Sequence, residues 1–200
     1  VAEGSGIDLE KGREFWSFKP PVKHPLPKLK NANWPQTEVD HFILAKQEQE
    51  GLIPASDADR ETLIRRAYFD LVGIPPRPEE IDAFLNDTSA NAFEKVIDNL
   101  LSSPHFGERW GRRWLDIARF AESSGGGRAL IFPNAWRYRD YVVNAFNQDK
   151  PYTQFVREQI AGDLLSSDSL ETRAEQIIAT GFLLLGPINY ELQDKELLRM

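Results

Sequence analysis

The sequence predicts an all-α protein, an irregular orthogonal bundle of about seven to nine short helices with an extended N-terminal arm. From Thr37 onward, apolar residues recur at helical spacing between recognisable helix starts and stops. No stretch shows the sustained alternation of a half-buried strand, and no Asn-Gly or Asp-Gly pair joins two β-branched runs. Many connections contain proline, which favours short helices packed at an angle over a long up-and-down bundle.

The N-terminal arm is dense in proline and aromatic residues between residues 15 and 35. Proline fixes φ and lacks an N–H donor, so this stretch is predicted to be extended rather than helical. We expect Phe15, Trp16, Phe18 and Trp34 to lie across the outside of the helical core, where their rings become buried. The predicted organisation is therefore an arm over residues 1–36, packed on a single helical domain over residues 37–200.

The first two helices of that domain have clear ends in the sequence. Thr37 and Asp40 resemble a capping box, in which each side chain reaches the other residue's backbone amide. Gly51 ends this helix. Asp57 or Asp59 begins the next one, which ends before a glycine and a proline pair.

Four of the later helices are predicted from a signal at their start or from one apolar face. Pro78 suits a first helical turn, because no intrahelical partner exists there for an amide hydrogen. Residues 91–102 place their apolar side chains on one face. Asn134 is a favourable N-cap for another helix. Thr172–Glu175 resembles a capping box at the start of a nearly all-apolar helix that runs through Leu185 and should be central.

Charge and composition exclude several classes of protein. The chain of 200 residues carries 24 Lys and Arg against 31 Asp and Glu, a net charge of −7. Nothing in this overall charge recruits nucleic acid or anionic lipid, so a general nucleic-acid binder is not expected. The longest apolar run, 177–186, is too short to span a bilayer, and no membrane insertion is expected.

No cofactor is expected within this chain. Without cysteine it can form no disulfide, no thiolate metal site and no Cys-x-x-Cys-His haem attachment. The three histidines, His24, His41 and His105, show no metal-binding spacing. The first dozen residues contain no apolar signal segment, and residues 191–200 read as a helix without a stop signal. The chain is therefore expected to be a fragment of a longer one.

Residues 107–122 form the most informative segment, predicted as one helix with two different faces. Arg109, Arg112, Asp116 and Arg119 fall on a polar stripe. One interpretation is a salt-bridged outer face, because Asp116 has an arginine at pairing distance on either side. The other is a site for an acidic ligand or partner, since planar guanidinium groups match carboxylate and sulfate oxygens. The opposite, apolar face consists of Trp110, Trp114, Ile117, Ala118 and Ala121.

A second cluster follows in the helix that Asn134 begins. Trp136, Arg137 and Asp140 point away from its predicted buried stripe of Tyr138, Tyr141, Val142 and Ala145. They could form a sugar-binding platform, because an aromatic face accepts C–H groups while charged groups bond hydroxyls. A partly buried ring beside an ion pair is the alternative.

Several motifs in a fixed order carry a resemblance to a known family that extends over about residues 15–200. They are Phe15–Pro21, Ala58–Arg60, Arg65–Arg66, Tyr68–Leu71, Gly73–Pro76, Ser103–Trp110, Asn134–Asp140 and Ala161–Leu165. The chain resembles the domain of unknown function found beside cytochrome-c-type domains in large planctomycete and related bacterial proteins. The resemblance implies an exported, extracytoplasmic protein with a cytochrome-c-type domain before this one and another domain after it. It also implies haem c in neighbouring segments of the polypeptide, and it supplies no catalytic residues.

Three functional hypotheses follow. The first is a non-catalytic helical module of a multidomain extracytoplasmic cytochrome-c-type protein, favoured because the sequence shows no catalytic triad, metal spacing or cofactor loop. The second is part of the substrate site of a haem-linked enzyme that oxidises acidic or sulfated polysaccharides. The third is a carbohydrate-binding module. Whether the domain takes part in catalysis is left open, as are its ligand, redox partner and oligomeric state.

Overall fold

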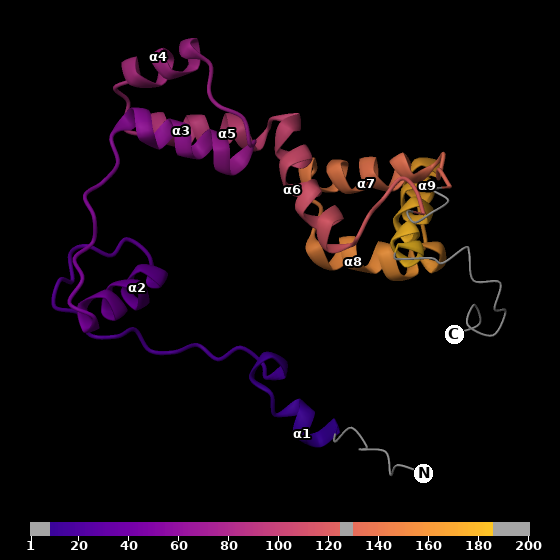
Figure 1. The fold of residues 1–200 in the computed structure, drawn as a ribbon, viewed down its shortest axis with the longest axis horizontal. Helices are drawn as coiled ribbons and strands as arrows, with labels where there is room; N and C mark the ends of the chain where they lie inside the picture. Colours follow the sequence, from indigo (N-terminus) through magenta and orange to yellow (C-terminus); the bar gives the residue numbers. More distant parts are fainter. Residues whose placement is uncertain (1–8, 125–129, 186–200) are drawn as a thin grey trace. The chain divides into compact units, whose positions relative to one another are not determined.

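The protein is all-α in the described residues of its computed structural model, 9–124 and 130–185 (Figure 1). These residues contain nine α-helices and no strand, which confirms the predicted fold class; Ser123 and Ile131 form an isolated bridge. The helix predicted over residues 191–200 lies outside the described residues.

The α-helices are α1 Leu9–Arg13, α2 Glu38–Gln49, α3 Arg60–Leu71, α4 Pro78–Asn86, α5 Ala92–Leu101, α6 Pro104–Ile117, α7 Ala135–Asn147, α8 Tyr152–Ala161 and α9 Leu170–Ala179. The 3₁₀ turns that accompany them are η1 Trp16–Phe18, η2 Gly162–Leu164 and η3 Thr180–Leu184.

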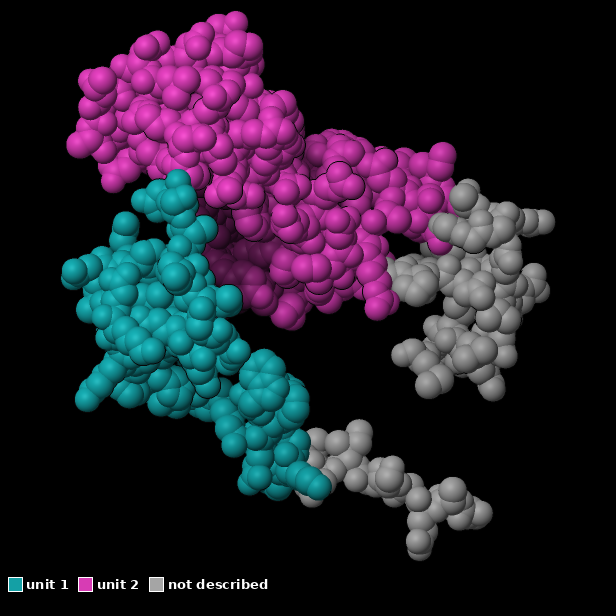
Figure 2. All heavy atoms as spheres, turned by 60° about the vertical axis from the view of Figure 1, so that its left-hand side comes forward, with its two compact units in different colours: residues 1–57 teal, residues 58–200 magenta. Residues whose placement is uncertain are grey.

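The chain divides into two compact units, residues 1–57 and residues 58–200 (Figure 2). The first unit holds the arm and α2, and the second holds α3 to α9. The predicted packing of the arm on the helical domain stays a prediction. None of the helices in the described ranges is both long and apolar enough to traverse a bilayer.

In the first unit, carboxylates fix both ends of α2. The predicted capping box is confirmed: Thr37 Oγ1 accepts the Asp40 N–H at 3.4 Å, and Asp40 Oδ2 accepts the Thr37 N–H at 2.8 Å. The Glu48 carboxylate accepts the backbone N–H groups of Lys30 and Asn31, at 2.9 Å from each. These hydrogen bonds hold the pKa of Glu48 below its usual value. Glu48 thus ties the end of the arm to α2.

The arm is less uniformly extended than the sequence predicts. Residues 16–18 close a 3₁₀ turn, and α1 precedes it. The first proline is Pro20, so the residues before it keep the amide hydrogens and the freedom in φ that helical turns need. Beyond the turn, residues 19–30 form no regular structure, as predicted.

The second unit contains two groups of helices that α6 connects, because α6 contacts α3 and α5 as well as α7. In the first group, α3 begins at the predicted N-cap Asp59 and packs with α4 and α5 around Ile64 and Phe84. Arg60 lies over the Phe84 ring at 4.1 Å and donates hydrogen bonds to the carbonyls of Phe84 and Asp87. This arginine therefore joins the start of α3 to the end of α4.

The second group, α6 to α9, holds the largest core cluster. Its buried members are Tyr138, Tyr141, Val142, Ala145, Phe155 and Ala179. The first four are the stripe predicted for α7, which is confirmed. Helices α6 and α7 approach closely at Gly107, where an added Cβ would lie 2.4 Å from the Val143 carbonyl oxygen. Any larger residue there would force these two helices apart.

The last predicted helix differs from the observed one at both ends. The N-cap of α9 is Ser169 rather than Thr172, because the Ser169 hydroxyl accepts the Thr172 N–H at 3.0 Å. It ends at Ala179, and the 3₁₀ turn η3 continues the chain from Thr180. The Thr180 hydroxyl donates to the Ile177 carbonyl at 2.7 Å, and such a bond competes with the regular helical pattern.

Candidate functional site

A pocket of about 660 Å³ lies between the end of α6, the start of α7 and the α9–η3 segment. Its volume is within the range of small-molecule sites, about 300–1,000 Å³. Two predicted site residues, Arg119 and Arg137, line it, and we refer to it as the Arg119–Arg137 pocket. Most of its wall is apolar and comes from Phe120, Phe132, Tyr138, Ile177, Ile178, Leu184 and Leu185.

Arg119 reaches the pocket because α6 ends earlier than predicted. The sequence predicts one helix over residues 107–122, but α6 ends at Ile117 and Arg119 adopts a left-handed φ of 59°. The Phe120 N–H bonds the Leu115 carbonyl at 2.9 Å and the Arg119 N–H bonds the Asp116 carbonyl at 3.2 Å. This is the Schellman pattern that ends many helices, usually with glycine where Arg119 stands.

The early end of α6 corrects the predicted two-faced helix. Ile117, assigned to the apolar face, has 79% of its surface exposed. Arg119 is turned off the helix and does not continue the stripe of Arg109, Arg112 and Asp116. The motif was missed because an arginine, not a glycine, holds the left-handed position.

The first turn of α7 places Arg137 in the pocket and Trp136 beside it. The Arg137 guanidinium lies 5.4 Å from the centre of the Trp136 ring, and that ring is 45% exposed. Asn134 occupies the predicted N-cap position, but its side chain makes no capping bond. Asp140 does not join them, since it pairs with Arg139 at 3.0 Å.

The remaining predicted residues do not line this pocket. Arg109 packs against Gly73, where an added Cβ would lie 2.9 Å from the arginine Cδ, and its buried Nε has no hydrogen-bond partner within the described ranges. Arg112 and Asp116 are exposed, and their side chains pair with no described residue. The structure thus brings together one arginine from each predicted cluster and leaves these three residues apart.

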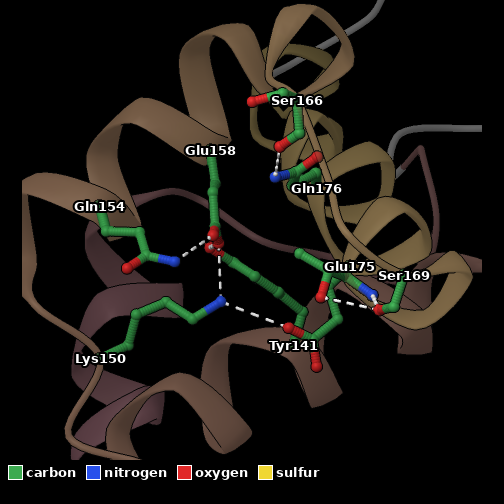
Figure 3. A network of polar contacts seen from close by, with 9 residues as sticks. Tyr141, Lys150, Gln154, Glu158, Ser166, Ser169, Glu175 and Gln176 are labelled. Atoms are coloured by element: carbon green, nitrogen blue, oxygen red, sulfur yellow. Dashed lines mark hydrogen bonds and ion pairs between the residues drawn. The ribbon is translucent and has the colours of Figure 1, made fainter.

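Sequence reasoning missed a buried network of charged and polar groups between α7, α8 and α9 (Figure 3). Glu158 has 2% of its side chain exposed and accepts hydrogen bonds from Tyr141 Oη at 2.7 Å, Lys150 Nζ at 2.7 Å and Gln154 Nε2 at 2.9 Å. Lys150 Nζ also lies 3.4 Å from Glu175 Oε2. Only the position of Glu158 on the same face of α8 as Phe155 could have indicated a buried acid.

The network fixes the protonation of its members. Burial alone would raise the pKa of Glu158, but the hydrogen bonds from Lys150, Gln154 and Tyr141 outweigh it and hold that pKa below the usual value. Burial, together with the Glu158 carboxylate, raises the pKa of Tyr141. Glu158 is therefore ionised and Tyr141 is a neutral donor at physiological pH.

A smaller network lies behind the pocket wall. Tyr138 Oη donates to Gln159 Oε1 at 2.6 Å, and Trp114 Nε1 lies 3.1 Å from Tyr138 Oη and 3.2 Å from Gln159 Oε1. Burial raises the pKa of Tyr138 to about 12. These bonds hold the Tyr138 ring in place, and the ring forms part of the apolar wall.

The lining of the pocket favours one kind of ligand. Its two cations line an apolar hollow, an arrangement that can hold an anionic group attached to an apolar or ring-shaped body. Within the part of the chain that the structure describes, no group of three His, Cys, Asp or Glu side chains is placed to hold a metal ion.

Comparison with known proteins gives one family. The family model described as PSCyt2, protein of unknown function (DUF1549), matches residues 38–200, which include α2 to α9 and both arginines of the pocket. Comparison with the curated proteins and with the solved structures finds no match.

Proposed function

We propose that this chain is a non-catalytic helical module of a larger protein. The chain belongs to the PSCyt2 family of planctomycete cytochrome-c-associated domains of unknown function. The larger protein is a multidomain, extracytoplasmic cytochrome-c-type protein, and the module positions its neighbouring domains. Haem c would be held by those neighbours, since this chain has no cysteine to attach it. The family's association with cytochrome-c-type proteins supports this context.

Exposed apolar surface on the last elements of the module carries the proposal. Leu164 in η2 is 81% exposed, Leu170 in α9 is 90% exposed, and Leu184 in η3 is 76% exposed. A contiguous apolar patch is typical of a surface that other protein parts cover, and we infer that these three leucines belong to one. Neighbouring domains of the same polypeptide are the covering parts that the family context suggests.

The natural full-length protein tests this proposal. We expect it to fractionate outside the cytoplasm, to stain for covalent haem, and to protect Leu170 from hydroxyl-radical labelling. Ile53 is the matched control, because it is also 90% exposed but belongs to the other unit. A cytoplasmic protein without haem, or equal labelling of Leu170 and Ile53, would contradict the proposal.

A second candidate function is favoured by the two arginines that line one pocket. In this hypothesis the domain supplies part of a substrate site for acidic or sulfated polysaccharides, either within a haem-linked oxidative enzyme or as a carbohydrate-binding module. Arg119 and Arg137 would pair with carboxylate or sulfate groups, and the exposed face of Trp136 would stack on a sugar ring. The neighbouring haem segments would carry out any oxidation.

Replacing both pocket arginines, with Arg119→Gln and Arg137→Gln together, is expected to weaken binding of uronic-acid or sulfated oligosaccharides about tenfold or more, because each charge-assisted hydrogen bond contributes about 1.5–3 kcal/mol. Calorimetric titration measures this. Binding by the unmodified chain should also weaken with salt, since exposed charges are screened over about 8 Å at physiological ionic strength.

Arg112→Gln is the matched control, because Arg112 is exposed, pairs with no described residue and does not line the pocket. It should bind like the unmodified chain. An equal loss in this control would show a diffuse charge effect, and no binding by the unmodified chain would remove this second candidate.

A further inference from the structure

Residues 11–30 of the N-terminal arm have a charge opposite to that of the whole chain. Residues 11–30 contain six basic side chains against the single acid Glu14, a formal charge of +5, whereas the complete chain carries −7. The basic residues are Lys11, Arg13, Lys19, Lys23, Lys28 and Lys30. This segment lies before residue 38, where the family match begins. It includes the motif Phe15–Pro21 of the resemblance, but the proposed function gives it no role.

Three aromatic rings stand together in the middle of this basic segment. Phe15 is 55% exposed, Trp16 is 77% exposed and Phe18 is 72% exposed. The Phe15 ring centre lies 5.9 Å from that of Trp16 and 6.3 Å from that of Phe18. The turn η1 gathers these rings, and the four prolines that follow keep the neighbouring lysines on an extended backbone.

The positive charges of the arm are only weakly neutralised by the protein. Arg13 pairs with Glu10 at 2.9 Å and Lys23 pairs with Glu38 at 3.2 Å, but all four side chains are largely exposed. Ion pairs of this kind contribute little and are readily exchanged. In the described ranges the side chains of Lys19 and Lys28 form no ion pair. The arm therefore offers free cations beside exposed rings.

We propose that the arm adsorbs to an anionic lipid surface through Phe15, Trp16 and Phe18, with the lysines on either side at the headgroups. Tryptophan and phenylalanine rings settle at the boundary between headgroups and acyl chains. Each lysine or arginine held near an anionic membrane contributes about 1 kcal/mol. This is adsorption by a short arm and requires no helix that spans the bilayer.

The overall charge of −7 does not oppose this adsorption. Charges are screened over about 8 Å at physiological ionic strength, so the lipid surface responds to the segment that touches it and not to the whole protein. The expectation that nothing recruits anionic lipid rests on the net charge of the whole chain, and our proposal departs from it for this arm. An extended segment can lie flat on the surface and bring its lysines into range together.

The test measures cosedimentation of the 200-residue chain with vesicles. We expect binding to vesicles that contain phosphatidylglycerol, little binding to pure phosphatidylcholine vesicles, and weaker binding as salt is added. Trp16→Ala with Phe18→Ala should weaken binding about tenfold or more, because burying each ring contributes about 1.5–3 kcal/mol. Lys19→Gln with Lys23→Gln should weaken it by a similar factor.

Matched controls come from outside the arm. Trp136→Ala removes another exposed ring, and Lys46→Gln removes another exposed lysine. Neither should change vesicle binding. Three results would overturn the proposal. The first is no preference for phosphatidylglycerol, and the second is binding that needs the lysines but not the rings, which would indicate a general polyanion site. The third is no vesicle binding together with a loss of unfolding free energy in the Trp16 and Phe18 variant. That last result would show that the arm packs on the helical domain instead. None of these outcomes depends on the haem context.

Discussion

Replacing Trp114 by alanine is expected to lower the free energy of unfolding by about 3–5 kcal/mol, the usual cost of removing a large ring from a core. The Trp114 ring meets Phe155 edge-on, with 4.9 Å between ring centres, and it packs against Phe182 at 6.1 Å. Its indole N–H also bonds the Tyr138 and Gln159 pair. The substitution therefore removes packing and a hydrogen-bond donor at once.

Trp136→Ala is the matched control for this experiment. Trp136 is 45% exposed and lies in the first turn of α7, so its removal should cost about 1 kcal/mol or less. Urea denaturation followed by far-ultraviolet circular dichroism compares the two variants without relying on tryptophan fluorescence. Equal shifts of the two midpoints would show that α6 does not turn Trp114 into the core.

Helix starts and buried stripes could be predicted because they depend on neighbouring residues. The capping box at Thr37, the N-cap Asp59 and the first-turn Pro78 all appear where the sequence places them. Each of these signals is a bond or a backbone preference within one turn of the chain. The apolar stripe of α7 needs only helical periodicity, and it is buried as expected.

Helix ends without glycine could not be predicted. Arg119 occupies a left-handed position that glycine usually fills, so the predicted helix continued past the true end of α6. Leu115 and Phe120 pack against the same core cluster, and their burial offsets the backbone cost at Arg119. This packing involves residues far apart in the sequence, so the sequence around Arg119 does not show that the helix ends there.

The pocket depends on contacts between distant parts of the chain. Arg119 and Arg137 were identified in separate clusters, and the turn at Arg119 brings both to one hollow. The opposite wall comes from residues such as Ile177 and Leu184, which the sequence marks only as apolar. The buried acid Glu158 was missed for a related reason: charged residues are expected at the surface unless a partner is known, and its partner Lys150 lies outside α8.

Replacing Lys150 by alanine is expected to cost about 3–5 kcal/mol of unfolding free energy at neutral pH, because it leaves the Glu158 carboxylate buried without its cation. Lys150 has 9% of its side chain exposed and Glu158 has 2%, so the two charges stabilise each other with little help from bulk water. Lys95→Ala is the matched control, since the ion pair of Lys95 with Asp87 is much more exposed. It should shift the urea midpoint far less.

The pH dependence of this loss separates an electrostatic effect from lost packing. In the unmodified chain the pKa of Glu158 is below its usual value. The ionised carboxylate therefore stabilises the fold at every pH above the ordinary glutamate pKa, and this contribution disappears as the pH falls through the lowered pKa. Without Lys150, burial is expected to dominate and to raise the pKa of Glu158. The free energy of unfolding of the variant is then lowered most at pH 7, and it is lowered less as the pH falls and the carboxyl group binds a proton. The difference between Lys150→Ala and the unmodified chain should therefore be largest near pH 7 and should shrink towards pH 4. Urea denaturation at both pH values measures it, and a loss of the same size at each would show that Lys150 acts through its packed side chain and not through its charge.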